Sequence, residues 1–438
     1  MEDSILKLSE DGKTLLEVTD KSVTEVVIPQ GVTTIGTCAF SFHHLQRIDI
    51  PDSVTVICRA AFFHCSALQS IDIPDSVTTI GQNAFCNCES LTSIEVSENN
   101  AHYTSIDGVL FDKHLTTVIC YPSNKGDEQY EIPNGITSIE NHAFHNCIFL
   151  KSINIPDSVT AIGQNAFYIC KSLTSIEVSE NNAHYTSIDG VLFDKHLTTV
   201  ICYPSNKGDE QYEIPNGITS IENHAFHNCI FFKSINIPNS VTSIGDWAFA
   251  DCSSLQSIDI PDGITSIGDN AFFYCDSLTS IEVSENNTHY TSIDGVLFDK
   301  HLTTIIRYPS GKGDEQYEIP NGITSIGNTA FFDCICLKSV NIPDSVTTIG
   351  QYAFDSCESL TSINIPNSVT SIGDCAFADC SSLQSIDIPN SVTYIAEDAF
   401  DYIDFEKCTL YIPSDTRWAY RHHPAFSGFK NIETVRYK

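Results

Sequence analysis

The 438-residue chain is poor in basic residues. It has 22 lysines and arginines against 56 aspartates and glutamates, which gives a formal net charge of −34. Phosphate backbones and anionic membrane surfaces would repel a chain of this charge. We therefore predict no nucleic-acid partner and no binding to an anionic membrane.

Long apolar runs are also missing. No stretch approaches the ~20 consecutive apolar residues that cross a bilayer, so we predict no membrane insertion. The opening MEDSILKLSEDGK places acids where a secretory leader has basic residues and then an apolar segment. With neither a signal peptide nor an anchor in view, the sequence by itself favours a cytoplasmic location.

Motifs of catalysis are absent too. The chain contains no nucleophile elbow, P-loop, HExxH or EF-hand loop, and its Asp-Gly pairs lack the oxygen-ligand spacing of a calcium loop. An enzyme needs an irregular pocket with perturbed groups, which a regular repeat seldom offers. The chain is therefore predicted to be non-enzymatic and to use no cofactor.

What the chain does contain is a repeat. Twelve short units, most of 23 residues, read roughly IP[DN][SG][VI]TxIGxxAFxxCxSLxSIx, and they open at prolines from Pro29 to Pro389. Three longer segments of 36 residues interrupt them, and each contains YTSIDGVLFDKHLTT. These long segments are 97–132, 179–214 and 284–319.

Two stretches that each contain a long segment and the short unit after it are nearly identical in sequence. Residues 97–156 and 179–238 differ only at Leu150 versus Phe232. This indicates a recent duplication, so agreement among the diverged short units is a better guide to structure than identity between these two copies.

Each part of the unit has a structural interpretation. The SIxI end alternates apolar and polar residues, which suits a short strand with one buried face. The following Pro-Asx-Ser or Pro-Asx-Gly has turn chemistry, VTxI is a second short extended piece, and Ala-Phe begins a single helical or 3-10 turn. One unit cannot bury its own apolar face, but stacked neighbours can. The predicted fold is a solenoid with a parallel sheet on one side.

The prediction extends to sixteen strands and two caps. Residues 1–28 read as an N-terminal cap with a hairpin around Glu10-Asp11-Gly12, 29–412 as the solenoid, and 413–438 as a C-terminal cap holding Trp418, Tyr420 and Phe426. The predicted strands end at residues 28, 50, 73, 96, 132, 155, 178, 214, 237, 260, 283, 319, 342, 365, 388 and 412. The Ala-Phe pair occurs in all twelve short units, so its phenylalanines are expected to stack as an internal ladder.

At these residues the chain resembles the BspA-like class of leucine-rich repeat proteins. Its hallmark is IPxSVTxIGxxAFxxCxxL, often with DGVLF…YP segments such as Asp107 to Pro122, and the resemblance covers residues 24–412. It implies a curved leucine-rich repeat solenoid with short strands and 3-10 turns opposite the sheet and three inserted hairpins. It also implies protein binding, with members often acting at the cell surface as adhesins for host matrix proteins or other cells.

The outward position of the predicted strands is mostly acidic. Like charges one strand apart repel, so salt and water or a cationic partner must offset them. Two interpretations stay open, a solvated face that keeps the sheet soluble and a binding surface for a basic or cation-bridged partner. The acidic residues are Asp49, Asp72, Glu95, Glu131, Glu177, Glu213, Asp259, Glu282, Glu318 and Asp387.

Tyrosines mark the long segments. Tyr103, Tyr185 and Tyr290 are expected on hairpins that leave the regular coil, where protruding aromatics are favoured contact residues. The alternative is that the tyrosines of these segments cover the gap where a Phe turn is missing. The sequence does not decide between the two.

Histidines and cysteines suggest a metal site only at first sight. His142, His145 and Cys147 spell HxxHxC, but the third copy has Thr329 and Phe332 at the histidine positions, so no metal site is predicted. Ten cysteines share one column after the Phe turn. We interpret them as small buried thiols, although the spacing of neighbouring units alone would permit disulfides.

Two functions remain. The first is a recognition or adhesion protein that binds a macromolecule through its acidic sheet face. The family resemblance implies that this partner is a host or matrix protein. The second is an intracellular scaffold or spacer that uses the array for multivalent protein interactions. Cell-surface labelling would favour the first, and a cytosolic, fully reduced pool the second.

Overall fold

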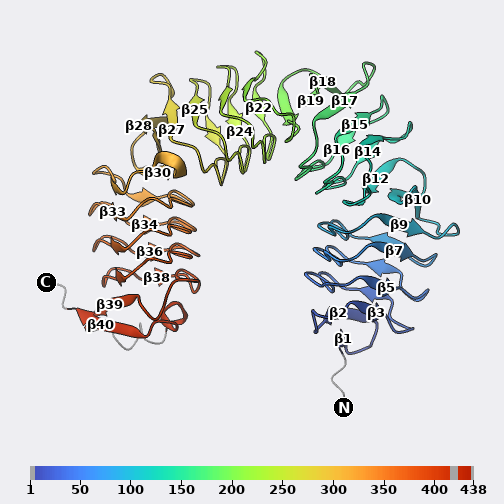
Figure 1. The fold of residues 1–438 in the computed structure, drawn as a ribbon, viewed down its shortest axis with the longest axis horizontal. Helices are drawn as coiled ribbons and strands as arrows, with labels where there is room; N and C mark the ends of the chain where they lie inside the picture. Colours follow the sequence, from blue (N-terminus) through green and yellow to red (C-terminus); the bar gives the residue numbers. More distant parts are fainter. Residues whose placement is uncertain (1–4, 415–422, 436–438) are drawn as a thin grey trace. The chain divides into compact units, whose positions relative to one another are not determined.

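A computed structural model describes residues 5–414 and 423–435. The chain forms two compact units, the first made of Met1–Gly208 with Asn223–His227 and the second of Asp209–Glu222 with Asn228–Lys438. Each unit is a stack of coils built from short strands and turns (Figure 1). Helical structure in the described residues is limited to the 3-10 turns η1 (Ser310–Lys312) and η2 (Pro424–Phe426).

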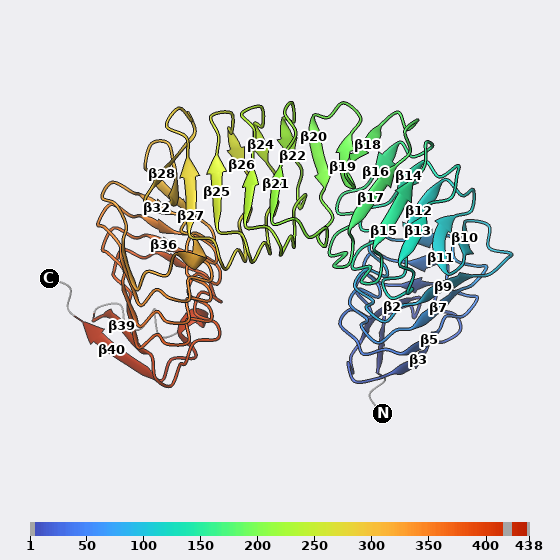
Figure 2. The same cartoon turned by 45° about the horizontal axis from the view of Figure 1, so that its top comes forward.

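The SIxI segments form the predicted parallel strands, which lie side by side within each unit (Figure 2). All sixteen end within one residue of the predicted position. In the first unit they are β3 (Glu25–Val27), β5 (Arg47–Asp49), β7 (Ser70–Ile73), β9 (Ser93–Val96), β13 (Gln129–Glu131), β15 (Ser152–Ile155) and β17 (Ser175–Val178). In the second unit they are β21 (Gln211–Glu213), β23 (Ser234–Asn236), β25 (Ser257–Ile260), β27 (Ser280–Val283), β31 (Gln316–Glu318), β33 (Ser339–Asn341), β35 (Ser362–Asn364), β37 (Ser385–Asp387) and β39 (Thr409–Pro413).

The VTxI segments form a second parallel ladder of two-residue strands. Most of these strands are followed by a glycine, which starts the next turn and so keeps the strand short. In the first unit they are β4 (Thr34–Ile35), β6 (Val56–Ile57), β8 (Thr79–Ile80), β14 (Ser138–Ile139) and β16 (Ala161–Ile162). In the second unit they are β22 (Ser220–Ile221), β24 (Ser243–Ile244), β26 (Ser266–Ile267), β32 (Ser325–Ile326), β34 (Thr348–Ile349), β36 (Ser371–Ile372) and β38 (Tyr394–Ile395).

The Ala-Phe segment is a run of consecutive turns rather than the single helical or 3-10 turn predicted for it. Most coils place two residues at positive φ there, one just before the alanine and one two residues after the phenylalanine. These positions accept even β-branched residues, as at Thr329 (φ +55°) and Ile169 (φ +60°). A left-handed residue cannot continue a right-handed helix, so the segment changes direction at each one.

The predicted phenylalanine ladder is confirmed within each unit. Phe40 stacks on Phe62 with ring centroids 5.0 Å apart, and in the second unit Phe354 lies 4.8 Å from Phe331 and 5.3 Å from Phe377. The backbone supports the same spacing, because the Phe354 N–H donates to the carbonyl of Ala376 in the next coil at 2.8 Å. The ladder therefore combines aromatic packing with coil-to-coil hydrogen bonds.

The cysteine column lies beside this ladder, buried as interpreted from the sequence. The Cys65 thiol donates to the Phe40 carbonyl of the preceding coil at 3.0 Å, and the Cys357 thiol donates to Phe331 in the same way. Burial raises the pKa of Cys65 to about 12. None of the eighteen cysteines, all of which lie in the described ranges, forms a disulfide bond.

Each long segment folds into three antiparallel strands. β11 pairs with both neighbours, and β12 then pairs in parallel with β14, so the second ladder resumes. The strands are β10 (Tyr103–Ile106), β11 (Val109–Asp112) and β12 (Thr117–Cys120), then β18 (Tyr185–Ile188), β19 (Val191–Asp194) and β20 (Thr199–Cys202), then β28 (Tyr290–Ile293), β29 (Val296–Asp299) and β30 (Thr304–Arg307).

A tyrosine replaces the missing phenylalanine in each long segment. Tyr121 is 3% exposed and stacks on Phe144 at 5.3 Å, and its N–H donates to the Ala143 carbonyl as a ladder phenylalanine would. Tyr203 and Tyr308 occupy the same place in their copies. For these three residues the gap-covering alternative is therefore correct.

The two ends of the array extend its ladders. At the start, β1 (Leu6–Leu8) and β2 (Thr14–Val18) form the expected hairpin, and β2 pairs in parallel with β4. At the other end, β40 (Asn431–Val435) adds a further parallel strand beside β39, and Phe426 stacks on Phe400. The two other aromatic residues of the predicted C-terminal cap, Trp418 and Tyr420, lie outside the described residues.

Truncation of one ladder ring should strongly destabilise the second unit. Phe354→Ala removes a fully buried ring that contacts rings on both sides, and we expect a loss of about 3–5 kcal/mol in the free energy of unfolding. Urea unfolding followed by circular dichroism measures it. The control Phe149→Ala removes an exposed ring and should change stability by about 0.5 kcal/mol or less. Equal effects of the two substitutions would contradict the ladder.

Candidate functional site

The acidic residues predicted at the outward strand positions do face away from the core. In β7, Ile71 and Ile73 are buried while Asp72 between them is exposed, and the other strands repeat this alternation. Nine of the ten predicted acids are exposed. The tenth, Asp387, is half-buried, and burial raises the pKa of its carboxyl group.

Two pairs of these acids lie directly opposite each other. Asp72 pairs with Glu95 across β7 and β9, and Asp259 pairs with Glu282 across β25 and β27. Directly opposed like charges destabilise a sheet, by roughly 0.2–1 kcal/mol per pair. These are the places where a cation would relieve the most repulsion.

Asparagines separate other acids along the same column. Asn154 lies between Glu131 and Glu177 in the sheet formed by β13, β15 and β17. Asn236 is likewise the neighbour of Glu213. The acidic column is therefore a series of short carboxylate groups rather than one continuous row.

Two shallow hollows lie on this face in the first unit. One, of about 400 Å³, is lined by the carboxylate residues Asp49, Asp72 and Glu95. The other, of about 370 Å³, is lined by Glu131, Glu177 and a residue that sequence reasoning missed, Asp157 of the Pro-Asp turn. The turn position did not reveal that Asp157 borders the strand face. Each hollow thus gathers three acidic residues.

Basic partners of these acids are scarce. Within the described part of the chain, Asp49 alone among the ten acids pairs with a basic side chain, Arg47, at 3.3 Å. Lysines that precede the strands pair instead with glutamates of the neighbouring coil, as Lys151 does with Glu128 at 2.7 Å. The lysines therefore neutralise glutamates that lie just before the strands. They leave the outward acidic residues within the strands charged.

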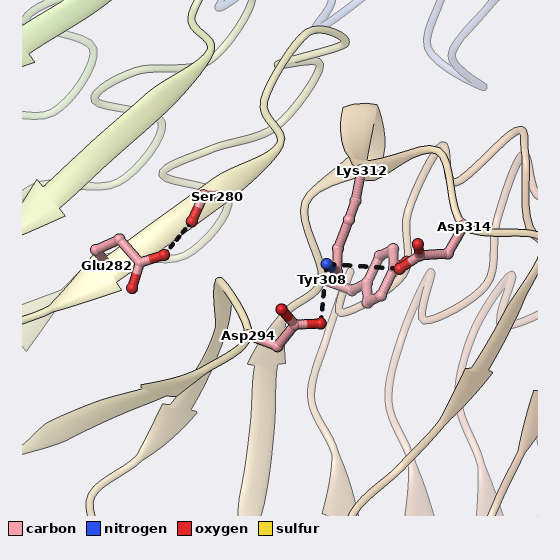
Figure 3. A network of polar contacts seen from close by, with 6 residues as sticks. All are labelled: Ser280, Glu282, Asp294, Tyr308, Lys312 and Asp314. Carbon is pink, nitrogen blue, oxygen red and sulfur yellow. Dashed lines mark hydrogen bonds and ion pairs between the residues drawn. The ribbon is translucent and has the colours of Figure 1, made fainter.

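Serines beside the column orient some of its carboxylates. The hydroxyl of Ser280 donates to Glu282, as Figure 3 shows, and Ser175 donates to Glu177 in the first unit. The other oxygen of Glu282 accepts a long hydrogen bond from the Ser292 hydroxyl at 3.5 Å. A carboxylate has about four acceptor positions, so both glutamates can accept further donors. The arrangement suits contact with an ammonium or guanidinium group.

The three tyrosines proposed as contact residues are less exposed than a protruding position implies. Tyr103, Tyr185 and Tyr290 are half-buried. Their hydroxyls accept the backbone N–H of Ile80, Ile162 and Ile267 at 2.9, 3.0 and 3.0 Å. Each tyrosine therefore satisfies a backbone donor of the preceding coil.

A lysine fastens the hairpin tip of each long segment. In the third, the Lys312 ammonium lies 3.1 Å from Asp294 and 3.6 Å from Asp314, and Tyr308 donates its hydroxyl to Asp314 at 2.7 Å (Figure 3). In the first, burial would lower the pKa of Lys125, but its two aspartate partners raise it overall. The sequence contained one indication of these ion pairs, because the lysine and its aspartate partners are present in all three long segments.

A buried asparagine starts each long segment and was also missed. Asn100 is 0% exposed, and its amide donates to the carbonyls of Pro74 and Val77 while its oxygen accepts from His102 and Tyr103. The amide thus ties the segment to the previous coil. Its contacts are 23 and 26 residues away in sequence, which no local pattern reveals.

The HxxHxC residues pack among aromatic rings. The rings of His142 and His145 lie 5.6 Å apart, and His145 lies 5.3 Å from Tyr168. Burial, followed by the charges of neighbouring histidines, lowers the pKa of His145 to about 3. Across the described ranges, no group of three or more histidines, cysteines or acids has a geometry that could hold a metal ion.

Comparison with known families agrees with this architecture. The model of the BspA-type leucine-rich repeat region, in six copies, matches residues 18–125, 120–208, 205–314 and 310–433. The chain belongs to this family. In the described residues of this BspA-type repeat protein, no helix is both long and apolar enough to cross a membrane.

Solved structures of bacterial leucine-rich repeat proteins are similar to this BspA-type chain. A leucine-rich cell surface protein from Faecalibacterium prausnitzii is 28% identical, with 99% of this chain and 93% of that chain covered and a TM-score of 0.50. A protein from Bacteroides ovatus is 27% identical over 97% and 94% of the two chains, with a TM-score of 0.37. One from Eubacterium ventriosum is 24% identical over 89% and 88%, with a TM-score of 0.44. No curated protein matches the chain.

Away from the sheet face, the second unit of this BspA-type protein holds a half-buried aspartate, Asp333, close to the carboxyl group of the exposed Asp276. Burial, and then the nearby Asp276 carboxyl group, raises the pKa of Asp333 to about 6. An unfolded aspartate titrates near pH 3.9. Between these values the folded chain keeps this proton and the unfolded chain loses it, so the contribution of Asp333 to stability is most favourable at low pH and falls as the pH rises to about 6.

Removal of this carboxylate should stabilise the protein in a pH-dependent way. Asp333→Asn should raise the free energy of unfolding at pH 7 by about 1–3 kcal/mol and leave it unchanged at pH 4. Asparagine fits, because Asn146 and Asn228 stand at the equivalent position of the other copies, and Asn146 there also has positive φ. Urea unfolding at both pH values tests this. The exposed control Asp344→Asn should have little effect, and an equal gain at pH 4 and pH 7 for Asp333→Asn would contradict the prediction.

Proposed function

We propose that this BspA-type protein is a non-enzymatic recognition protein that binds a basic segment of a partner protein on its acidic sheet face. The observation that carries the proposal is the gathering of three acidic residues around each hollow of the first unit, with a single arginine as their counter-ion in the described residues. A cationic side chain from a partner would relieve the repulsion between opposed acids such as Asp72 and Glu95.

The shape of the face supports an extended partner. Parallel strands present their outward residues in a line, spaced by about 4.8 Å from strand to strand. Lysines or arginines on an extended chain, with alternate side chains pointing the same way, could follow such a line. The hollows are shallow, which suits side chains better than a small ligand.

Location at the cell surface is part of the proposal. The Faecalibacterium protein similar to this chain is described as a cell surface protein. A host or matrix protein with a basic segment is the kind of partner that a surface protein would meet.

An intracellular scaffold is the second candidate, and the cysteines favour it. In the described residues no cysteine forms a disulfide bond, which is the usual state in a reducing compartment. Biotinylation of intact cells separates the two candidates, because a surface protein is labelled and a cytosolic one is labelled only after lysis.

Neutralising one hollow should weaken binding of a basic probe. The probe is a fluorescent octalysine peptide, followed by anisotropy at low salt. Each exposed charge contact contributes about 0.5 kcal/mol, so the triple variant Asp49→Asn, Asp72→Asn, Glu95→Gln should bind about tenfold more weakly.

The matched control removes the same charge elsewhere in the first unit. Glu10→Gln, Glu89→Gln, Glu98→Gln changes three exposed acids that do not line the hollow. This control should lose less than about twofold, because only the general attraction of the net charge is reduced. If both triple variants lose affinity equally, the acidic face is only a solvated surface and the proposal fails.

A further inference from the structure

A pocket of about 270 Å³ opens on the ladder of short strands in the first unit, away from the acidic face. Fifteen residues line it. They come from the coil that contains β8, from the first long segment, and from the coil that contains β14, so the pocket lies where the long segment interrupts the ladder. Cys86, Tyr103, Cys120 and His142 are among them.

The second copy of this region differs at one lining position. Residues 82 positions further along the chain are the same type as the lining residue at fourteen of the fifteen positions. The exception is Cys86, whose counterpart is Tyr168. The chain therefore contains its own comparison of the same lining with a thiol and with a phenol ring.

In the second copy the tyrosine ring packs on the far wall. The Tyr168 ring lies 4.7 Å from the ring of His224, the counterpart of His142, and 4.4 Å from that of His227. The third copy is similar in this respect, because Phe273 at the same position stacks on Phe332 at 3.9 Å. Two of the three long segments thus carry an aromatic ring of their own where the first carries Cys86.

Two buried polar atoms of the pocket residues lack a partner among the described residues. Asn83 Oδ1 and His142 Nδ1 are inaccessible to water and make no hydrogen bond. Burial lowers the pKa of His142, so its imidazole is neutral at pH 7. The Asp112 carboxylate is already engaged, because it accepts hydrogen bonds from the backbone and side chain of Thr116 and from the backbone of Thr117.

We propose that this pocket binds the ring of a neutral monocyclic phenol, which takes the place that the Tyr168 side chain fills in the second copy. The ring packs between Cys86 and His142, and a rotation of the Asn83 amide turns its unpaired oxygen, which is inaccessible without ligand, towards the hydroxyl that donates to it. A hydrocarbon ring of the same size would leave that oxygen unpaired and would bind less tightly. The inference is independent of the proposed function, since none of the ten acidic residues lines the pocket.

The test uses p-cresol, the side-chain analogue of tyrosine, with the full-length protein and isothermal titration calorimetry. A ligand of this size is expected to bind with a Kd of about 0.1–1 mM, and toluene at least severalfold more weakly. N-acetyltyrosinamide is titrated in parallel. Binding of p-cresol alone identifies a free phenol as the ligand, and binding of both admits a tyrosine side chain of a partner.

Two reciprocal variants make the test specific. Cys86→Tyr copies the second region and should abolish p-cresol binding, whereas Tyr168→Cys copies the first region and should raise the stoichiometry from one site to two. Circular dichroism and urea unfolding confirm that each variant is folded. The proposal is overturned if the unaltered protein shows no saturable p-cresol binding, or if Cys86→Tyr binds as well as the parent.

Discussion

Contact between neighbouring coils is the constraint on which the rest of this structure depends. No coil buries its own apolar face, and each one donates backbone N–H groups to the next, as when the Phe331 N–H donates to the Ala353 carbonyl at 2.7 Å. The Ala-Phe column follows from this requirement, because alanine lets the turns approach and phenylalanine fills the interior. The long segments obey the same rule with Tyr121, Tyr203 and Tyr308 in place of phenylalanine.

The candidate binding face is a direct result of this stacking. Once the isoleucines of each SIxI strand point inward, the residue between them must point outward, and it meets its counterpart in the next strand. Charge at that position is therefore repeated along the face. Each long segment interrupts the regular stacking of the coils. The pocket that Cys86 lines lies at the first of these interruptions.

Periodic features of this protein could be predicted from its sequence, and contacts between coils could not. Strand ends and the buried phenylalanines followed from columns that recur every 23 residues. Asn100 and Asp157 were missed because their roles depend on residues of the adjacent coil. The sequence left open whether Tyr103 protrudes, because a hairpin pattern does not show that its hydroxyl reaches the Ile80 N–H at 2.9 Å. The pocket joins Cys86 to His142, which lie in coils separated by a whole long segment.

Deletion of whole and partial coils tests the central claim most directly. A chain without residues 343–365 loses one complete unit. In this chain β33 is followed by the Pro-Asn turn that begins at Pro366, which is equivalent to the deleted turn, so neighbouring coils can stack again. A chain without residues 343–354 loses fewer residues, but it lacks β34 and the Phe354 ring. Urea unfolding should show a smaller loss of stability for the longer deletion than for the shorter one. A loss that grew with the number of residues removed would contradict the account.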